Sequence, residues 1–132
     1  MEIKDIPVSR LMTEELVTVT PETQLADAGE TLRDRAIGSL VVVDSADQLV
    51  GILTSTDFVD FVVGGGEVAD ATVAAVMTES VVTVGPQATI SDAAAKMISD
   101  DIQHLPVEAD DGTVAGMLST TDLTAHLAYL EA

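Results

Sequence analysis

Two seven-residue segments, Gly51 to Asp57 and Gly116 to Asp122, carry the side chains of this chain that are best suited to hold a small polar molecule. Each has a glycine, two apolar residues, a hydroxyl residue, one further residue, a threonine and an aspartate, and the second copy follows 65 residues after the first. One carboxylate can accept hydrogen bonds from both adjacent hydroxyls of a ribose, and hydroxyls at a helix N-terminus add donors for phosphate. These residue types predict a site for a nucleoside with an anionic tail.

The same spacing also fits a simple helix cap. In Thr54-x-x-Asp57 and Ser119-x-x-Asp122 a hydroxyl stands at the N-cap and an acidic residue three positions later, as in a capping box. Such a cap stabilises a helix by about 1 kcal/mol and needs no ligand. Both interpretations stay open, because a capped helix N-terminus is also a fixed site for an anion.

The chain as a whole is internally duplicated. A shift of 65 residues aligns residues 3–58 with 68–123 without a gap, and Met12-Thr13, for example, returns as Met77-Thr78. Two copies are too few for an open solenoid, so we expect a closed pair with pseudo-two-fold symmetry. The predicted boundaries are a first repeat at 1–63, a glycine-rich linker at 64–67 and a second repeat at 68–132.

Each copy predicts the order helix-strand-helix-strand-strand-helix. In the first copy these elements are a helical turn at 5–11, a strand at 18–19, an amphipathic helix from Leu25, strands at 40–43 and 49–53, and a helix from Thr54. We expect a three-stranded sheet with helices on one face in each copy, which is an α+β fold. In the second copy Pro106 lacks a backbone donor, so its strand is expected to pair on one side only at that point.

Composition excludes several classes of function. The 132 residues carry 23 Asp and Glu against 5 Lys and Arg, a formal net charge of −18, which disfavours surfaces for nucleic acid or anionic membranes. With 47% hydrophobic residues the chain can still bury one shared core. An acidic, folded surface of this kind is typical of salt-accumulating cells, where salt screens self-repulsion, so we expect a halophilic source.

No residue pattern indicates catalysis or a metal centre. Cysteine is absent, His104 and His126 have no third ligand at metal spacing, and there is no Ser-His-Asp order or phosphate loop. The first residues do not resemble a signal peptide, and no apolar run approaches the length of a membrane span. We therefore expect a cytoplasmic protein that is not an enzyme.

With both copies in register, the chain resembles a tandem pair of cystathionine-β-synthase (CBS) domains, the arrangement called a Bateman module. The motifs that carry the resemblance are Met12-Thr13, Val17-Thr18-Val19, Pro21, Leu40 to Asp44 and Gly51 to Asp57, with the second set Met77-Thr78, Val82-Thr83-Val84, Pro86, His104 to Val107 and Gly116 to Asp122. The resemblance implies two clefts between the repeats that bind AMP, ADP, ATP or S-adenosylmethionine. It implies no required cofactor, with Mg²⁺ as an optional companion of a phosphate tail.

By position in these motifs, the resemblance assigns Asp57 and Asp122 to the ribose. Residues implied to contact ribose or phosphate are Thr54, Thr56, Ser119 and Thr121, and those implied to line the phosphate side are Ser39, Gln103 and His104. Ile37 and Ile102 would pack against adenine, and Thr18 and Thr83 would each reach the cleft dominated by the other repeat. Because His104 stands where the first copy has Ser39, we expect unequal clefts, with the Asp122 cleft favouring anionic tails.

The implied function is that of a regulatory sensor module. Ligand binding would favour one geometry of the repeats or of a homodimer formed through the helices, and so signal to a regulated protein that the sequence does not identify. Apolar helix residues available for such a dimer include Phe58, Val59, Val62 and Ala93 to Ala95. The alternative is a structural or protein-interaction module with non-functional clefts, in which the repeated motif serves only as a cap.

Overall fold

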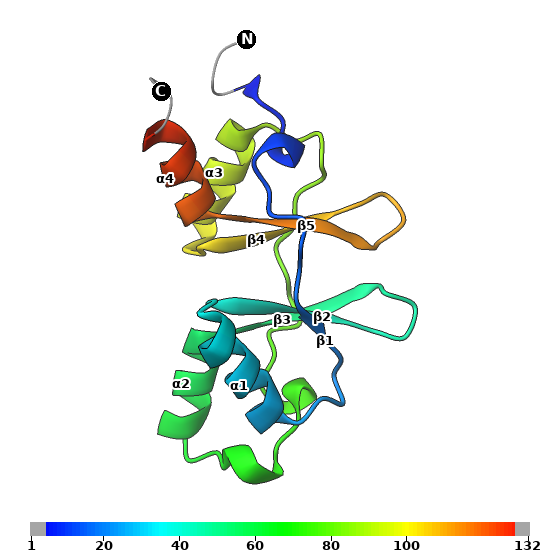
Figure 1. Ribbon diagram of the computed structural model, residues 1–132, viewed down its shortest axis with the longest axis vertical. Helices are drawn as coiled ribbons and strands as arrows, with labels where there is room; N and C mark the ends of the chain where they lie inside the picture. Colours follow the sequence, from blue (N-terminus) through cyan, green and yellow to red (C-terminus); the bar gives the residue numbers. More distant parts are fainter. Residues whose placement is uncertain (1–4, 129–132) are drawn as a thin grey trace. The chain divides into compact units, whose positions relative to one another are not determined.

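Two small sheets and four α-helices form the α+β fold of the computed structural model, which describes residues 5–128 (Figure 1). Contacts divide the chain into two compact units. Unit 2 is residues 17–81, whereas unit 1 combines residues 5–16 with residues 82–128. None of the helices in residues 5–128 is long and apolar enough to cross a membrane. The predicted fold class is confirmed.

Unit 2 contains the complete three-stranded sheet. Its elements are β1 (Thr18–Val19), α1 (Leu25–Arg35), β2 (Ser39–Val43), β3 (Leu49–Thr54), α2 (Ser55–Val63) and two 3₁₀ turns, Val68–Asp70 and Val73–Ala75. β1 pairs parallel to β2, and β2 pairs antiparallel to β3. α1 and α2 cover the same face of this sheet (Figure 1). The core between them includes Leu25, Leu40 and Leu53, all fully buried.

Unit 1 repeats this plan with a contribution from the start of the chain. Its elements are a 3₁₀ turn at Val8–Arg10, α3 (Ile90–Asp100), β4 (His104–Glu108), β5 (Val114–Ser119) and α4 (Thr120–Ala128). Val8 is fully buried among Leu105, Leu118 and their neighbours. Its N–H donates to the carbonyl of Ala88 at 2.7 Å, so the N-terminal segment belongs to the core of this unit.

The sheet of unit 1 differs from expectation. We predicted three strands, but β4 and β5 form a two-stranded sheet, and Val84 adds only a single parallel bridge to Val107. Val84 donates to the carbonyl of Pro106 at 3.2 Å and accepts from Glu108 at 2.8 Å. In a parallel ladder the preceding bond would come from the N–H of residue 106, which proline lacks. The predicted loss of pairing at Pro106 therefore shortens the ladder that β1 completes in unit 2.

The glycine-rich segment ends α2 and packs within unit 2. Gly66 donates to the carbonyl of Phe61 at 2.8 Å, and Gly65 has a φ of 93°, in the left-handed region that glycine tolerates. The two units are defined by contacts between residues, whereas the predicted linker at 64–67 was defined by the repeat in the sequence, so the units do not test that linker. Those boundaries stay a prediction.

In each unit a Met-Thr segment lies along the edge of the strand that carries the motif. In unit 2, Thr78 and Ile52 exchange two backbone hydrogen bonds, of 2.8 and 3.0 Å. In unit 1, Thr13 and Met117 do the same at 2.8 and 2.9 Å. The repeated Met-Thr motif is thus the partner of the repeated Gly-to-Asp motif.

The motif glycines make these bridges possible. A Cβ atom at Gly51 would lie 2.8 Å from the sulfur of Met77 and 3.1 Å from the carbonyl oxygen of Thr78. At Gly116 the corresponding distances are 2.6 Å to the sulfur of Met12 and 2.9 Å to the carbonyl oxygen of Thr13. A side chain at Gly116 would force the bridging backbone to shift, and one at Gly51 would displace the Met77 side chain and press on the bridging backbone.

We therefore expect Gly51→Ala and Gly116→Ala to destabilise the fold by about 1–3 kcal/mol, the usual cost of overpacking, with the larger loss at Gly116 because its distances are shorter. Urea unfolding in molar KCl would measure both. Gly85→Ala is the matched control, since a Cβ there meets nothing within 4 Å. Equal stabilities for all three variants would contradict the close approach.

Candidate functional site

The repeated motif forms the same strand-to-helix corner in both units. β3 ends at Thr54 and α2 begins at the next residue; β5 ends at Ser119, where α4 follows in the same way. Strand pairing places Ser39 directly opposite Thr54, and His104 directly opposite Ser119. The structure thus brings together, within each unit, the hydroxyl, the aspartate and the residue predicted to line the phosphate side.

Both corners are complete capping boxes. In unit 2 the N–H of Asp57 donates to Thr54 Oγ1 at 3.2 Å, and the N–H of Thr54 donates to Asp57 Oδ2 at 2.9 Å. In unit 1 the N–H of Asp122 donates to Ser119 Oγ at 3.0 Å, and the N–H of Ser119 donates to Asp122 Oδ2 at 2.9 Å. The predicted caps are confirmed, and each uses one carboxylate oxygen, Oδ2, of its aspartate.

The first turn of each helix keeps one backbone donor for solvent. The N–H of Ser55 donates to the carbonyl of Gly38 at 3.1 Å, and that of Thr120 donates to the carbonyl of Gln103 at 3.0 Å. The next residues, Thr56 and Thr121, are exposed, and helix geometry gives their N–H groups no intrahelical partner. An anion placed there would meet a backbone N–H and a threonine hydroxyl together.

A contact that sequence reasoning missed distinguishes the two aspartates. Thr78 Oγ1 donates to Asp57 Oδ1 at 3.3 Å, so both carboxylate oxygens of Asp57 have protein donors. Thr13 is the counterpart of Thr78, yet within residues 5–128 no hydrogen bond joins its hydroxyl to Asp122. The repetition of Met-Thr in both copies was the available signal, but it did not reveal which strand the segment would join.

His104 supplies a different neighbour to the Asp122 corner. The imidazole is half-buried, and loss of water lowers its pKa from the ordinary value of 6.5, an effect that the negative charge of Asp122 partly offsets. At neutral pH the imidazole is therefore uncharged and can act as a hydrogen-bonding group. An anion bound beside it would favour the protonated form.

The remaining predicted residues are two isoleucines beside the cores and two threonines outside them. Ile37 and Ile102 are half-buried against their own cores, after the left-handed residues Ala36 and Asp101 that end α1 and α3. Thr18, in β1, belongs to unit 2 with Asp57, and Thr83 belongs to unit 1 with Asp122. The predicted roles of these four residues towards adenine or the opposite cleft stay predictions.

A cavity of about 280 Å³ opens between α1 and α2 of unit 2. Its lining is mainly apolar and consists of Gly29, Leu32, Arg33, Ile37, Ser55 and Phe58. Of the predicted ligand residues it includes only Ile37, and the Asp57 carboxylate is not part of it. Its volume is at the lower limit of pockets that hold small molecules.

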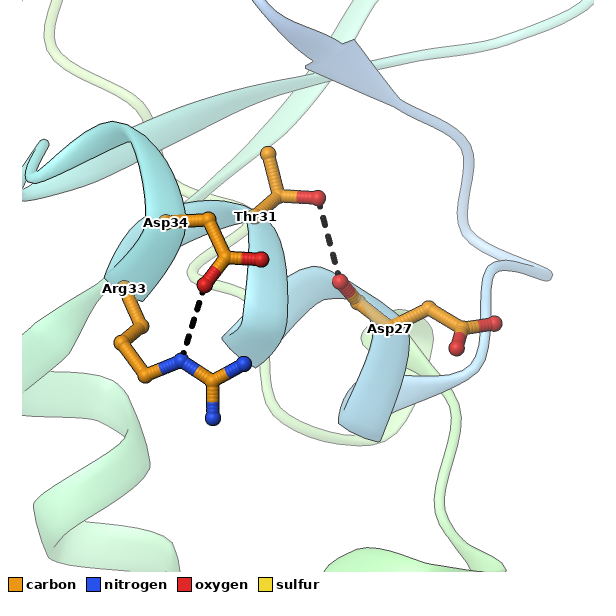
Figure 2. Close-up of polar contacts among 4 residues, drawn as sticks. All are labelled: Asp27, Thr31, Arg33 and Asp34. Carbon is orange, nitrogen blue, oxygen red and sulfur yellow. Dashed lines mark hydrogen bonds and ion pairs between the residues drawn. The ribbon is translucent and has the colours of Figure 1, made fainter.

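Two cations of the described chain, Arg33 and Lys96, are engaged in contacts of their own. Figure 2 shows Arg33 in the last turn of α1, with its Nε 2.9 Å from Asp34 Oδ1, on the same helix in which Thr31 donates to the carbonyl of Asp27. Lys96 Nζ donates to the carbonyl of Thr83 at 2.8 Å. Residues 5–128 contain no cluster of three or more His, Asp or Glu side chains that could hold a metal ion.

Comparison with known proteins gives a consistent family. The sequence model described as CBS domain matches residues 3–64 and 73–129. Inosine-5'-monophosphate dehydrogenase of Nitrosopumilus maritimus is 32% identical over 119 residues, which are 90% of this chain but 24% of that protein. The chain thus spans about a quarter of the length of this relative.

Two similar solved structures contain bound ligands. The CBS domain pair of protein MJ0100, in complex with 5'-methylthioadenosine and S-adenosyl-L-methionine, matches with a TM-score of 0.84 and 25% identity over 92% of this chain and 98% of that chain. CBSX2 in complex with AMP matches with a TM-score of 0.85 and 25% identity over 96% and 99%. These matches confirm the resemblance that the repeated motifs indicated.

The half-buried imidazole of His104 predicts an acid-side loss of stability. Because folding lowers its pKa, the unfolded chain binds the proton at higher pH than the folded protein. The stability that depends on neutral His104 is therefore fully present above about pH 6.5 and is lost as the pH falls from there through the lower folded pKa. Urea unfolding of the protein and of His104→Gln, between about pH 7.5 and about pH 5, would measure this.

We expect His104→Gln to lose less stability than the unchanged protein over that interval. The other titrating groups are common to both proteins, so the difference between the two curves reports on residue 104. Parallel curves would show that the imidazole is not desolvated.

Proposed function

This chain belongs to the CBS-domain family, and we propose that it is a regulatory CBS pair that binds an adenosyl ligand at its Asp57 and Asp122 corners. AMP, ADP, ATP and S-adenosylmethionine are the proposed ligand class. Binding would shift the population of unit or dimer geometries, and a regulated protein would respond to that shift.

The duplicated capping box is the observation that carries the proposal. In each unit one carboxylate oxygen is held by the cap, the second lies at the same corner, and an exposed threonine N–H stands one residue before the aspartate. A ribose diol could bond to the second oxygen while a phosphate bonds to the helix N-terminus. Adenosyl ligands combine these two groups, and the two neighbouring structures with such ligands support the choice.

Catalysis is not part of the proposal. In residues 5–128 no hydrogen bond pairs a hydroxyl of either corner with a base such as His104. The dehydrogenase relative is about four times as long as the region it shares with this chain. With a formal charge of −18, the protein repels a triphosphate more strongly than a monophosphate, and it attracts the cationic sulfonium of S-adenosylmethionine. ATP would therefore depend more strongly on salt or Mg²⁺.

The completeness of the capping boxes also favours a second candidate, a structural or interaction module that has lost ligand binding. Capping alone accounts for the Thr54–Asp57 and Ser119–Asp122 bonds. In the first candidate the second carboxylate oxygen binds the ribose of a ligand, whereas in the second candidate it binds no ligand. An experiment can distinguish the two.

Thermal unfolding in molar KCl with AMP, ADP, ATP or S-adenosylmethionine tests the proposal. A ligand present at 100 times its Kd is expected to raise the unfolding free energy by about 2.7 kcal/mol. Asp122→Asn and Asp57→Asn should each remove binding at one corner and change the unliganded stability little, because asparagine retains an oxygen for the cap. If no ligand moves the melting temperature, and the asparagine variants are markedly less stable, the structural module is the correct interpretation.

We also propose that the chain forms a homodimer through its helices. α2 exposes Val59 (59%), Val62 (54%) and Val63 (81%), an apolar surface on one short helix. Val62→Glu should lower the mass measured by light scattering from dimer to monomer, whereas Ser45→Glu, in the exposed β2–β3 turn, should leave it unchanged. A monomeric parent protein, or a Val62→Glu dimer, would count against this interface.

A further inference from the structure

The second carboxylate oxygen of Asp57 already has a donor in the unliganded protein. The capping bond from the Thr54 N–H takes one acceptor position of Oδ2, at 2.9 Å, so Oδ1 is the oxygen without a backbone donor and the one that a ligand diol would reach more readily. Thr78 Oγ1 lies 3.3 Å from that atom and donates to it. A ligand hydroxyl and the Thr78 hydroxyl would therefore both donate to Oδ1 of Asp57.

Backbone bonds hold Thr78 at this place. Its N–H donates to the carbonyl of Ile52 at 2.8 Å, and its carbonyl accepts from the N–H of Ile52 at 3.0 Å. Gly51 allows this segment to come so close, because any Cβ there would lie 3.1 Å from the Thr78 carbonyl oxygen. Only a side-chain rotation is needed to move the hydroxyl away from Asp57, so the contact can open without loss of the bridge.

Unit 1 provides the matched case without this contact. Thr13 makes the same backbone bridge, to Met117, at 2.8 and 2.9 Å. Within residues 5–128 its hydroxyl makes no hydrogen bond to Asp122, and Oδ2 of Asp122 is used by the Ser119 cap. The two corners therefore share a backbone and differ in whether the ligand-facing oxygen is already bonded.

We propose that the Thr78 hydroxyl acts as an internal competitor for the Asp57 carboxylate, so that the Asp122 corner fills first and the Asp57 corner fills only at higher ligand concentration. This rests on the proposed function, since it concerns the order in which the two corners take up an adenosyl ligand. A module built this way responds to a ligand over a wider range of concentration than one with two equal sites.

The experiment uses proteins in which one corner binds. In the Asp122→Asn background, titration calorimetry with AMP in molar KCl measures the Asp57 corner. Thr78→Val should tighten the Kd by about threefold to tenfold, because one exposed hydrogen bond to a carboxylate no longer has to be broken. Thr78→Ser keeps the hydroxyl and should leave the Kd unchanged. In the Asp57→Asn background, Thr13→Val should have no effect.

The ligand can be varied to isolate the diol. 5'-Methylthioadenosine, which has the diol but no phosphate, should show the same gain with Thr78→Val. 2',3'-Dideoxyadenosine monophosphate has no diol and should show none. A gain that is equal with and without the diol would assign the effect to packing and overturn the proposal.

Other results are equally decisive. If Thr78→Val weakens AMP binding, Thr78 positions the carboxylate for the ligand; if the Kd does not change, the contact does not compete. Either outcome overturns the proposal while the proposed function stands.

A double-mutant cycle on unliganded unfolding tests the contact independently of any ligand. Thr78→Val and Asp57→Asn should be coupled, whereas Thr13→Val and Asp122→Asn should be additive. Absence of coupling between positions 78 and 57 overturns the proposal. Coupling without any adenosyl binding, in the parent protein or the variants, would instead reject the proposed function and leave the contact established.

Discussion

Each unit depends on a backbone-to-backbone approach that only glycine permits. Gly51 and Gly116 let a Met-Thr segment lie against the strand that leads into the capped helix. The bridge fixes the edge of that strand, the strand fixes the corner, and the corner fixes the aspartate. Because interiors are close-packed, a methyl group at either glycine would press directly on the bridging Met-Thr segment. The first residue of the motif, glycine, thus has a structural role, whereas the last, aspartate, is the residue proposed to bind the ligand.

Local chemistry explains why much of the fold could be predicted. Thr54 and Asp57 stand at capping-box spacing, and such a box forms between residues three positions apart with no distant partner. The same holds for the buried run of β2 and for the proline that shortens the second sheet, since the missing N–H of Pro106 is a property of one residue. Where contacts between residues close in sequence determine the local structure, the amino-acid sequence is sufficient to predict it.

The contacts that were missed all join distant segments. Nothing in the sequence near Asp57 indicates that the hydroxyl of Thr78 will reach it, because that contact depends on the segment after Val73 returning to β3. Nor does the repeat show that residues 5–16 pack with residues 82–128. The offset of 65 residues identifies equivalent positions, but equivalent positions need not make equivalent side-chain contacts, as Thr13 and Thr78 demonstrate.

The division of the chain into a continuous and a discontinuous unit has a consequence for the order of folding. Unit 2 is one uninterrupted segment, so all of its partners have been synthesised once residue 81 is added, while much of unit 1 is still to be made. Unit 1 needs Thr13 to meet Met117, and the loop that this contact closes contains the whole of unit 2. A long closure is slow while the intervening chain is unstructured, and it shortens once that chain has folded. Early folding of residues 17–81 therefore shortens the flexible chain that separates residues 5–16 from residues 82–128.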